Sequence, residues 1–212
     1  MEDEFYSDFL ERINDFHNNE PRAFCFDLAL SLINTAKADD LENWYYHNKT
    51  IEGILLLLFC WNFASPITKK LTKQRIESLL RNSKDDLISL EQYSIANINE
   101  NAHQIILRLF KEFKNTFGQT GASKALSLLN TKLFIMWDTK IRRQLVRMNI
   151  VSRIGNGENP EDYLQYLLDI KNVIQRNQLT SLINNPDNIA KKIDEFHYAK
   201  IVVGISNINQ NV

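Results

Sequence analysis

The chain of 212 residues is 44% hydrophobic and 24% charged, the balance of a globular protein that buries a core, and its formal net charge is −1. Its two cysteines, Cys25 and Cys60, exclude a four-cysteine zinc site or iron–sulfur cluster supplied by this chain alone. Both lie in apolar runs, which predicts buried free thiols in a reducing compartment. The longest apolar run, 54–64, is far shorter than the roughly 20 residues that span a bilayer. Together with the acidic start MEDEF, which is unlike a secretory signal, it leads us to expect a cytoplasmic protein that does not enter a membrane.

Charge is distributed unevenly along the chain. Residues 1–50 contain eleven acidic and four basic residues, whereas the remainder contains 21 basic and 15 acidic residues. The segment 124–153 holds seven Lys or Arg residues and a single acid, Asp138. Such a segment can bind a polyanion although the whole protein is nearly neutral. A solvent-exposed helix face explains the same run equally well, so charge alone does not decide between them.

Helices are expected almost throughout, because apolar residues recur at helical spacing and no segment alternates as a strand does. Pro21 is typical of a first helical turn, Ser83 is an expected N-cap, and Gly118 is an expected helix end. The sequence therefore predicts an all-α fold of about ten helices. We expect these helices over 5–16, 21–37, 51–63, 69–82, 83–90, 100–116, 121–130, 139–148, 160–177 and 188–205.

The stretch NTFGQTGASKALSLLN (115–130) holds the clearest motif in the chain. A helix that ends at Gly118 and another that begins near Ala122 would expose backbone N–H groups at the second start, where the helix dipole favours a phosphate. Glycine permits left-handed backbone and a close approach by a sugar–phosphate chain. Lys124 falls in the first turn of the second helix. Many helical hairpins contain glycine, so this pattern has little specificity by itself.

The order of the parts adds specificity. A long helix, a glycine turn, a helix with an early lysine, a connector and an aspartate that begins another helix resembles the helix-hairpin-helix DNA glycosylases, the superfamily of endonuclease-III-like and 8-oxoguanine glycosylases. Its G-x-G-x-K-x-A hairpin is matched here by Gly121, Lys124 and Ala125, and its aspartate by Asp138 in MWDTKI. The resemblance covers about 51–155. The chain departs from the pattern because Gly121 stands three residues before Lys124 rather than two, the connector is short, no histidine closely follows Asp138, and there is no cluster-binding cysteine set.

The resemblance implies a two-lobed fold with a helix-hairpin-helix element in a glycosylase-like core, 51–155. The acidic segment 1–50 is expected to pack with the C-terminal helices of 156–212. The implied function is base excision repair of DNA, in which a damaged base is flipped out of the double helix and excised. Lys124 would attack the sugar as an amine of lowered pKa and form a Schiff base, and Asp138 would stabilise the positive charge that develops. This lysine implies abasic-site lyase activity as well.

The resemblance implies further site residues as well. Expected groups in the base pocket, or filling the gap left by the flipped base, are Trp137, Asn62 and Ser65. We expect no cofactor, and no metal because the four histidines are scattered. The implied partner is double-stranded DNA with a damaged base or abasic site, bound by a monomer that associates with the nucleoid in a prokaryote. The expected DNA contacts are Gly118, Thr120, Gly121, Ser123, Lys140, Arg143 and Arg147.

Structural interpretations remain open beside these. Lys124 is equally consistent with a lysine on a helix surface, and Trp137 is equally consistent with a core residue. Asp138 is equally consistent with an N-cap, a role that is compatible with catalysis. Tyr163 and Tyr166 share a face with Leu167 that is more typical of a core than of a base pocket. The whole chain also fits a nucleic-acid-binding relative that does not cut. A third alternative is a helical interaction protein whose acidic N-terminal segment binds a basic partner.

Overall fold

The computed structural model describes residues 4–62, 71–152, 159–182 and 188–203. Within these ranges the chain is helical with no strand, which confirms the all-α prediction. Ser65 lies outside the described residues. The α-helices are α1 (Phe9–Asn19), α2 (Pro21–Asp39), α3 (Asn48–Asn62), α4 (Lys73–Asn82), α5 (Lys84–Leu90), α6 (Glu100–Leu129), α7 (Thr139–Arg147), α8 (Pro160–Arg176) and α9 (Ile189–His197). Short 3₁₀ helices include η1 (Glu4–Tyr6), η2 (Trp44–Tyr46), η4 (Ile95–Asn97) and η5 (Leu179–Leu182), and the π-helix η7 (Tyr198–Val203) follows α9. None of the described helices has the length and apolar character that a membrane span requires.

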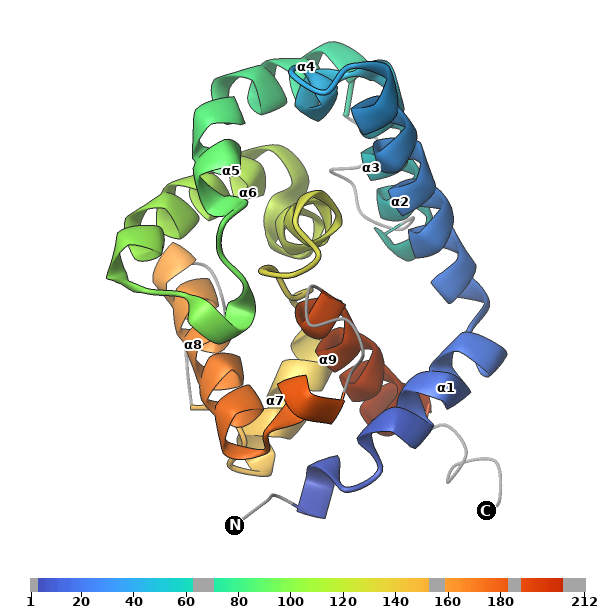
Figure 1. Ribbon diagram of the computed structural model, residues 1–212, viewed down its shortest axis with the longest axis vertical. Coiled ribbons are helices and arrows are strands. Elements are labelled where there is room, and N and C mark those ends of the chain that lie inside the picture. The colour runs from blue at the N-terminus through green and yellow to red at the C-terminus, as the bar shows by residue number, and fades with distance from the viewer. Residues whose placement is uncertain (1–3, 63–70, 153–158, 183–187, 204–212) are drawn as a thin grey trace.

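The second part of α6 is the centre of the molecule. The other helices surround it, with α2 and α3 on one side, α4 and α5 above, and α7, α8 and α9 below (Figure 1). All nine residues from Gly121 to Leu129 are buried. A helix that is covered on every side is normally apolar all round. A lysine within this segment is therefore the exception that needs an explanation.

Gly118 breaks α6 into two segments that run in different directions (Figure 1). Its φ of 73° and ψ of 172° lie in a region that is essentially open only to glycine. The predicted boundary between the two helices is thus found at the expected residue. The second segment resumes at once, so Gly121 lies inside a helix and is buried, not in an exposed turn.

Side chains begin several of these helices as the sequence suggests. Asn99 caps α6 by accepting hydrogen bonds from the N–H groups of Asn101 (3.1 Å) and Ala102 (3.3 Å). Pro160 lies in the first turn of α8. Ser83 stands at the N-cap position of α5 but makes no capping bond there, because its hydroxyl donates to Glu112 Oε2 at 3.1 Å.

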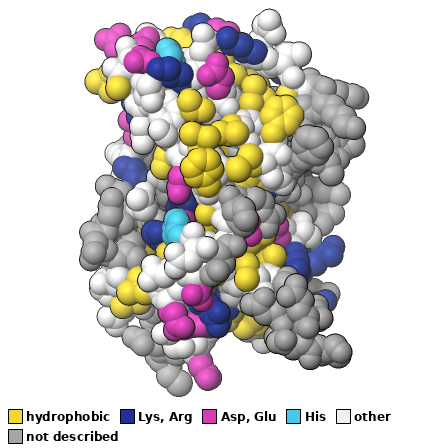
Figure 2. Space-filling view, turned by 90° about the vertical axis from the view of Figure 1, so that its right-hand side faces the viewer, with side chains coloured by type: hydrophobic (Ala, Val, Ile, Leu, Met, Phe, Trp, Pro, Cys, Tyr) yellow, Lys and Arg dark blue, Asp and Glu magenta, His cyan; other side chains and the backbone are white. Residues whose placement is uncertain are grey.

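The most closely packed helix pair is α2 with α3. A Cβ atom on Gly53 would lie 2.8 Å from the carbonyl oxygen of Ala29, so glycine permits this approach. Both cysteines are free thiols, as expected, but they are half-buried and not buried. The reason is that the outer side of this pair faces solvent, where Phe24 is 69% and Phe59 is 46% exposed. Figure 2, which views this side of the molecule, shows hydrophobic side chains gathered in its upper half.

The acidic segment 1–50 has two neighbours. Helix α1 packs against α9 and η7, and the Tyr6 hydroxyl is 2.8 Å from Nε2 of the buried His197. Helix α2 packs along α3 instead. The first part of the segment therefore packs on the C-terminal helices as expected, while α2 also touches α9 through Phe26, whose ring centroid lies 4.1 Å from the Lys191 amine.

Candidate functional site around Lys124

Lys124 is the buried cation of the central helix. Its side chain is 5% exposed, and its amine donates a hydrogen bond to the carbonyl oxygen of Trp61 at 3.2 Å. The amine also lies 5.3 Å from the centroid of the Trp61 ring. Carbonyls in the last turn of a helix lack intrahelical partners and carry the negative end of the helix dipole. The end of α3 therefore supplies both a hydrogen bond and a favourable charge to an ammonium group that would otherwise be costly to bury.

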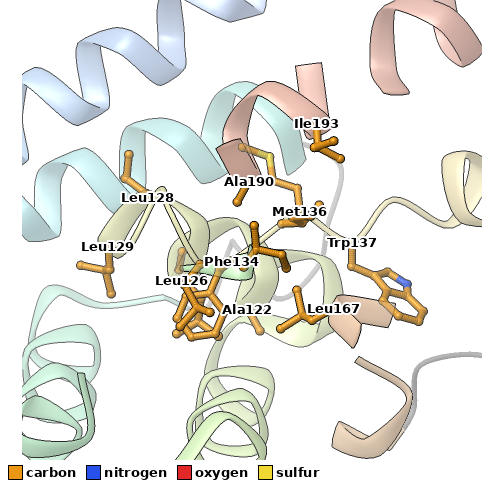
Figure 3. Packing of buried hydrophobic residues seen from close by; sticks show 14 of the residues in the cluster. Ala122, Leu126, Leu128, Leu129, Phe134, Met136, Trp137, Leu167, Ala190 and Ile193 are labelled. Carbon is orange, nitrogen blue, oxygen red and sulfur yellow. The ribbon is translucent and has the colours of Figure 1, made fainter. Parts of the chain in front are cut away.

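A hydrogen bond ties the connector between α6 and α7 to the central helix. The backbone N–H of Trp137 donates to Ser123 Oγ at 2.7 Å, and that hydroxyl donates to the carbonyl of Thr120 at 3.0 Å. This bond joins the residue before Lys124 to the residue before Asp138. The backbones that carry the two predicted catalytic residues are thus neighbours across the connector. Figure 3 shows the same region, with Met136 and Trp137 of the connector between residues of α6, α8 and α9.

Asp138 caps helix α7. Its Oδ1 accepts hydrogen bonds from the N–H groups of Lys140 (2.8 Å) and Ile141 (3.0 Å), which confirms the N-cap interpretation. No described residue donates to Oδ2. The side chain is held at the start of the helix while one of its oxygens remains available.

Asp194, on α9, is a carboxylate that the sequence did not single out. It is half-buried, and no described residue donates a hydrogen bond to its carboxylate. Burial is the main cause that raises the pKa of Asp194 to about 7. The positive charges of Lys191 and Lys124 oppose this rise, and the negative charges of Glu195 and Asp138 add to it. The charges of both predicted catalytic residues thus act on the Asp194 carboxylate. It stands 70 residues from Lys124 in the chain, and in an amphipathic helix it looks like any polar-face residue.

Aromatic side chains surround these charged groups. Trp137 is 1% exposed, and its ring makes an edge contact with Tyr166 at 5.5 Å between centroids. The guanidinium of the buried Arg142 lies 5.0 Å from the Trp137 ring centroid. Trp137 is thus a core residue here, as the structural interpretation expects, and its role in a base pocket stays a prediction. The side chains of Tyr163, Tyr166 and Leu167 are buried, as expected for a core face.

The predicted DNA contacts divide by exposure. Lys140, Arg143 and Arg147 are exposed on α7, while Gly118 and Thr120 are half-buried. Gly121 and Ser123 are buried, so the structure does not present them to DNA. Their misplacement follows from treating 118–121 as an open turn, whereas the helix resumes directly after Gly118 and turns both residues toward the core. Asn62 is the last residue of α3, and its side chain is outside the described part.

A cavity of 720 Å³ lies at the far end of α7 from Asp138, between α7 and α8. It is lined by Arg147, Asn149, Asp169 and Arg176, among others. The Asp169 carboxylate is already engaged, since it accepts from the N–H of Ser152 at 2.8 Å and from Gln165 at 2.9 Å. This cavity is separate from the Lys124 site, and its acid holds Ser152 in the loop that follows α7.

Among the described residues no cluster of three or more His, Cys, Asp or Glu side chains is arranged to hold a metal ion. The candidate site therefore consists of Lys124, Asp138 and Asp194, brought together from the central helix, the start of α7 and α9. Neither the family models, nor the curated proteins, nor the solved structures contain a match to this chain.

Proposed function

We propose that this protein is a DNA glycosylase with abasic-site lyase activity, which excises a damaged base from double-stranded DNA. One observation carries the proposal: the residue before a buried lysine on the central helix is hydrogen-bonded to the residue before Asp138, and the charges of that lysine and of Asp138 both act on Asp194. Burying an ammonium is costly, so a buried lysine close to carboxylates is a candidate for a functional residue.

The proposed reaction begins with a base flipped out of the helix, since its glycosidic bond is unreachable in the stack. The amine of Lys124, once deprotonated, attacks C1′ of the sugar, and the bond from C1′ to the base breaks. Asp138 stabilises the positive charge that develops on the sugar through its free oxygen. Opening of the sugar ring then gives an imine between Nζ and C1′, and loss of the C2′ proton allows β-elimination of the 3′ phosphate.

The exposed cations of α7 support binding to the DNA backbone. Lys140, Arg143 and Arg147 lie on the surface of the helix that Asp138 begins, so a strand held there would run past the candidate site. Phosphate contacts of this kind are sequence-independent and weaken steeply with salt. Neutralising Arg143 and Arg147 together is expected to lower both the affinity and its salt dependence.

A second function has an observation of its own. The hydrogen bond from Lys124 to Trp61 gives this lysine a structural task at the end of α3, and the side chain is almost fully covered. A nucleic-acid-binding relative that does not cut would keep this contact for stability alone. In that case replacement of Lys124 would lower stability without abolishing any reaction.

Borohydride trapping distinguishes the two functions. The protein would be mixed with labelled duplexes that contain an abasic site, 8-oxoguanine, uracil or an oxidised pyrimidine, and reduced. Lys171 on α8 is a matched control, because its amine also donates to a backbone carbonyl, that of Ile98 at 2.8 Å, but it is not part of the candidate site. We expect a covalent adduct with the unmodified protein and with Lys171→Gln, and none with Lys124→Gln.

Circular dichroism at the assay temperature must show that both variants are folded. Salt-sensitive duplex binding with no adduct on any duplex would select the non-cutting relative. The absence of both binding and adduct would refute both functions and favour a helical protein that binds another partner through its acidic segment.

A further inference from the structure

We propose that Asp194 is the proton acceptor for Lys124, and that it returns this proton to the hydroxyl group that leaves when the Schiff base forms. This inference rests on the proposed function and adds a third residue to it. Sequence resemblance points only to Lys124 and Asp138, so Asp194 comes from the tertiary structure.

Trp61 places Asp194 near the lysine. The Lys124 amine binds the Trp61 carbonyl, and the Trp61 ring makes an edge contact with Tyr198 at 5.3 Å between centroids. Tyr198 follows Asp194 by one helical turn, and its N–H donates to the Asp194 carbonyl. Residues four apart share a helix face, so the face that carries Asp194 is directed toward the end of α3 where the amine is bound.

The connector lies against the start of α9, the helix that carries Asp194. The N–H of Lys191 donates to the carbonyl of Thr131 at 3.3 Å, which anchors the start of α9 on the connector. Figure 3 shows Ile193 lying next to Met136, two residues before Asp138. The contact of Tyr198 with Trp61 and the bond of Lys191 to Thr131 therefore bring this part of α9 to the junction between the central helix and the start of α7.

Asp194 differs from the other acids nearby in that neither of its oxygens has a donor among the described residues. Glu195, its neighbour on α9, is engaged by Lys191, Lys192 and His17. Asp138 uses Oδ1 to cap α7. The Asp194 carboxylate receives no hydrogen bond from the described residues, so an incoming proton has a site there.

The charged and titratable groups whose charges act on or from Asp194 come from its own helix and from three others, while His17 of α1, the helix packed on the other part of α9, faces the neighbouring Glu195. They are Lys191 and Glu195 on its own helix, Asp138 at the start of α7, Lys124 on α6, and Tyr163 and Tyr166 on α8. Burial and the two acids raise the pKa of Asp194 to about 7 against the two lysines. An acid that titrates near neutrality can both take up and release a proton at physiological pH.

The steps balance for an abasic site in its aldehyde form. An N–H bond of the ammonium breaks and the proton moves to Asp194, which leaves a lone pair on Nζ. That pair forms a bond to C1′, and the aldehyde becomes a carbinolamine after proton transfer from nitrogen to oxygen. Protonated Asp194 gives its proton to the hydroxyl, water leaves, and the protonated imine and the Asp194 carboxylate result.

The test is the pH profile of borohydride trapping on an abasic duplex, measured for the unmodified protein, Asp194→Asn and Asp194→Glu. General acid–base catalysis is typically worth about 10²-fold or more, so we expect Asp194→Asn to slow trapping by about that factor near pH 7. The deficit should shrink as the pH rises, because a growing share of the lysine amine is then deprotonated without help. Asp194→Glu keeps a carboxylate and should recover part of the rate.

Each outcome separates the inference from the function it rests on. If the unmodified protein forms no adduct, the proposed function fails and this role fails with it. If it forms the adduct but Asp194→Asn reacts at the same rate, or is slowed equally at every pH, only the proton-transfer role is overturned. Thermal melts of both variants identify a loss of fold. If Asp194→Asn has lost its fold, the pH profile of trapping by Asp194→Glu decides whether Asp194 transfers the proton, because a purely structural role predicts a trapping rate that does not depend on the titration of this carboxylate.

Discussion

Replacement of Ser123 by alanine tests the bond that holds the connector to the central helix. The change removes the acceptor of the Trp137 N–H, which is 2.7 Å from Ser123 Oγ and has no other acceptor among the described residues. A buried N–H without a partner costs about 1–3 kcal/mol, while alanine regains about 0.5 kcal/mol of helix propensity. We therefore expect Ser123→Ala to lower the free energy of unfolding by about 2 kcal/mol.

Ser127 supplies the matched control one turn further along the same helix. It is also buried, but its hydroxyl only donates to the Lys124 carbonyl at 2.9 Å, so Ser127→Ala leaves no donor without an acceptor. Its cost should be no more than about 0.5 kcal/mol, since a typical hydrogen bond is worth little net. Urea denaturation followed by the helical circular dichroism signal measures both. Equal costs for the two variants would refute the reasoning that the connector depends on Ser123.

Three further changes test the site and its scaffold. Asp138→Ala should cost about 1 kcal/mol in thermal or urea unfolding through loss of the cap, whereas Asp138→Asn keeps an acceptor and should cost much less; equal losses would contradict the capping role. Gly53→Ala should be destabilising by about 1–3 kcal/mol despite alanine's better helix propensity, because its Cβ would lie 2.8 Å from the Ala29 carbonyl; a stabilised variant would show that α2 and α3 separate easily. Asp194 has a pKa of about 7 when folded against an ordinary 3.8, so it favours the folded state fully below about pH 4 and loses that contribution as the pH rises through about 7. Asp194→Asn should therefore gain stability relative to the unmodified protein at about pH 8, by at most about 4 kcal/mol and nearer 2 kcal/mol because water reaches the half-buried carboxylate; a difference that does not vary with pH would contradict the shift.

Local chemistry explains why many helices could be predicted. Asp138 begins α7 and Pro160 begins α8 because each supplies what a first turn needs, whatever lies around it. Gly118 breaks α6 because few other residues adopt its backbone angles. Tyr163 and Tyr166 are in the core because helical periodicity places them on one apolar face.

Some errors had the same local origin. Ser83 has the right type and position for a cap, but the nearby Glu112 accepts its hydroxyl instead. Cys25 and Cys60 lie in apolar runs, yet a run shows only that a helix is hydrophobic, and the outer side of α2 and α3 has no covering element among the described residues.

The sequence by itself determined the helical class, the helix boundaries set by caps and glycine, and the candidate pair Lys124 and Asp138. Only the tertiary structure decided that Lys124 is buried, because an early lysine in a short helix looks the same whether the helix is central or peripheral. Only the tertiary structure showed that Asp194 belongs with this pair, because charge acts through space and α9 is far from both residues in the chain. The physical reason is that helical periodicity records which residues share a face, while the identity of what covers that face depends on every other helix.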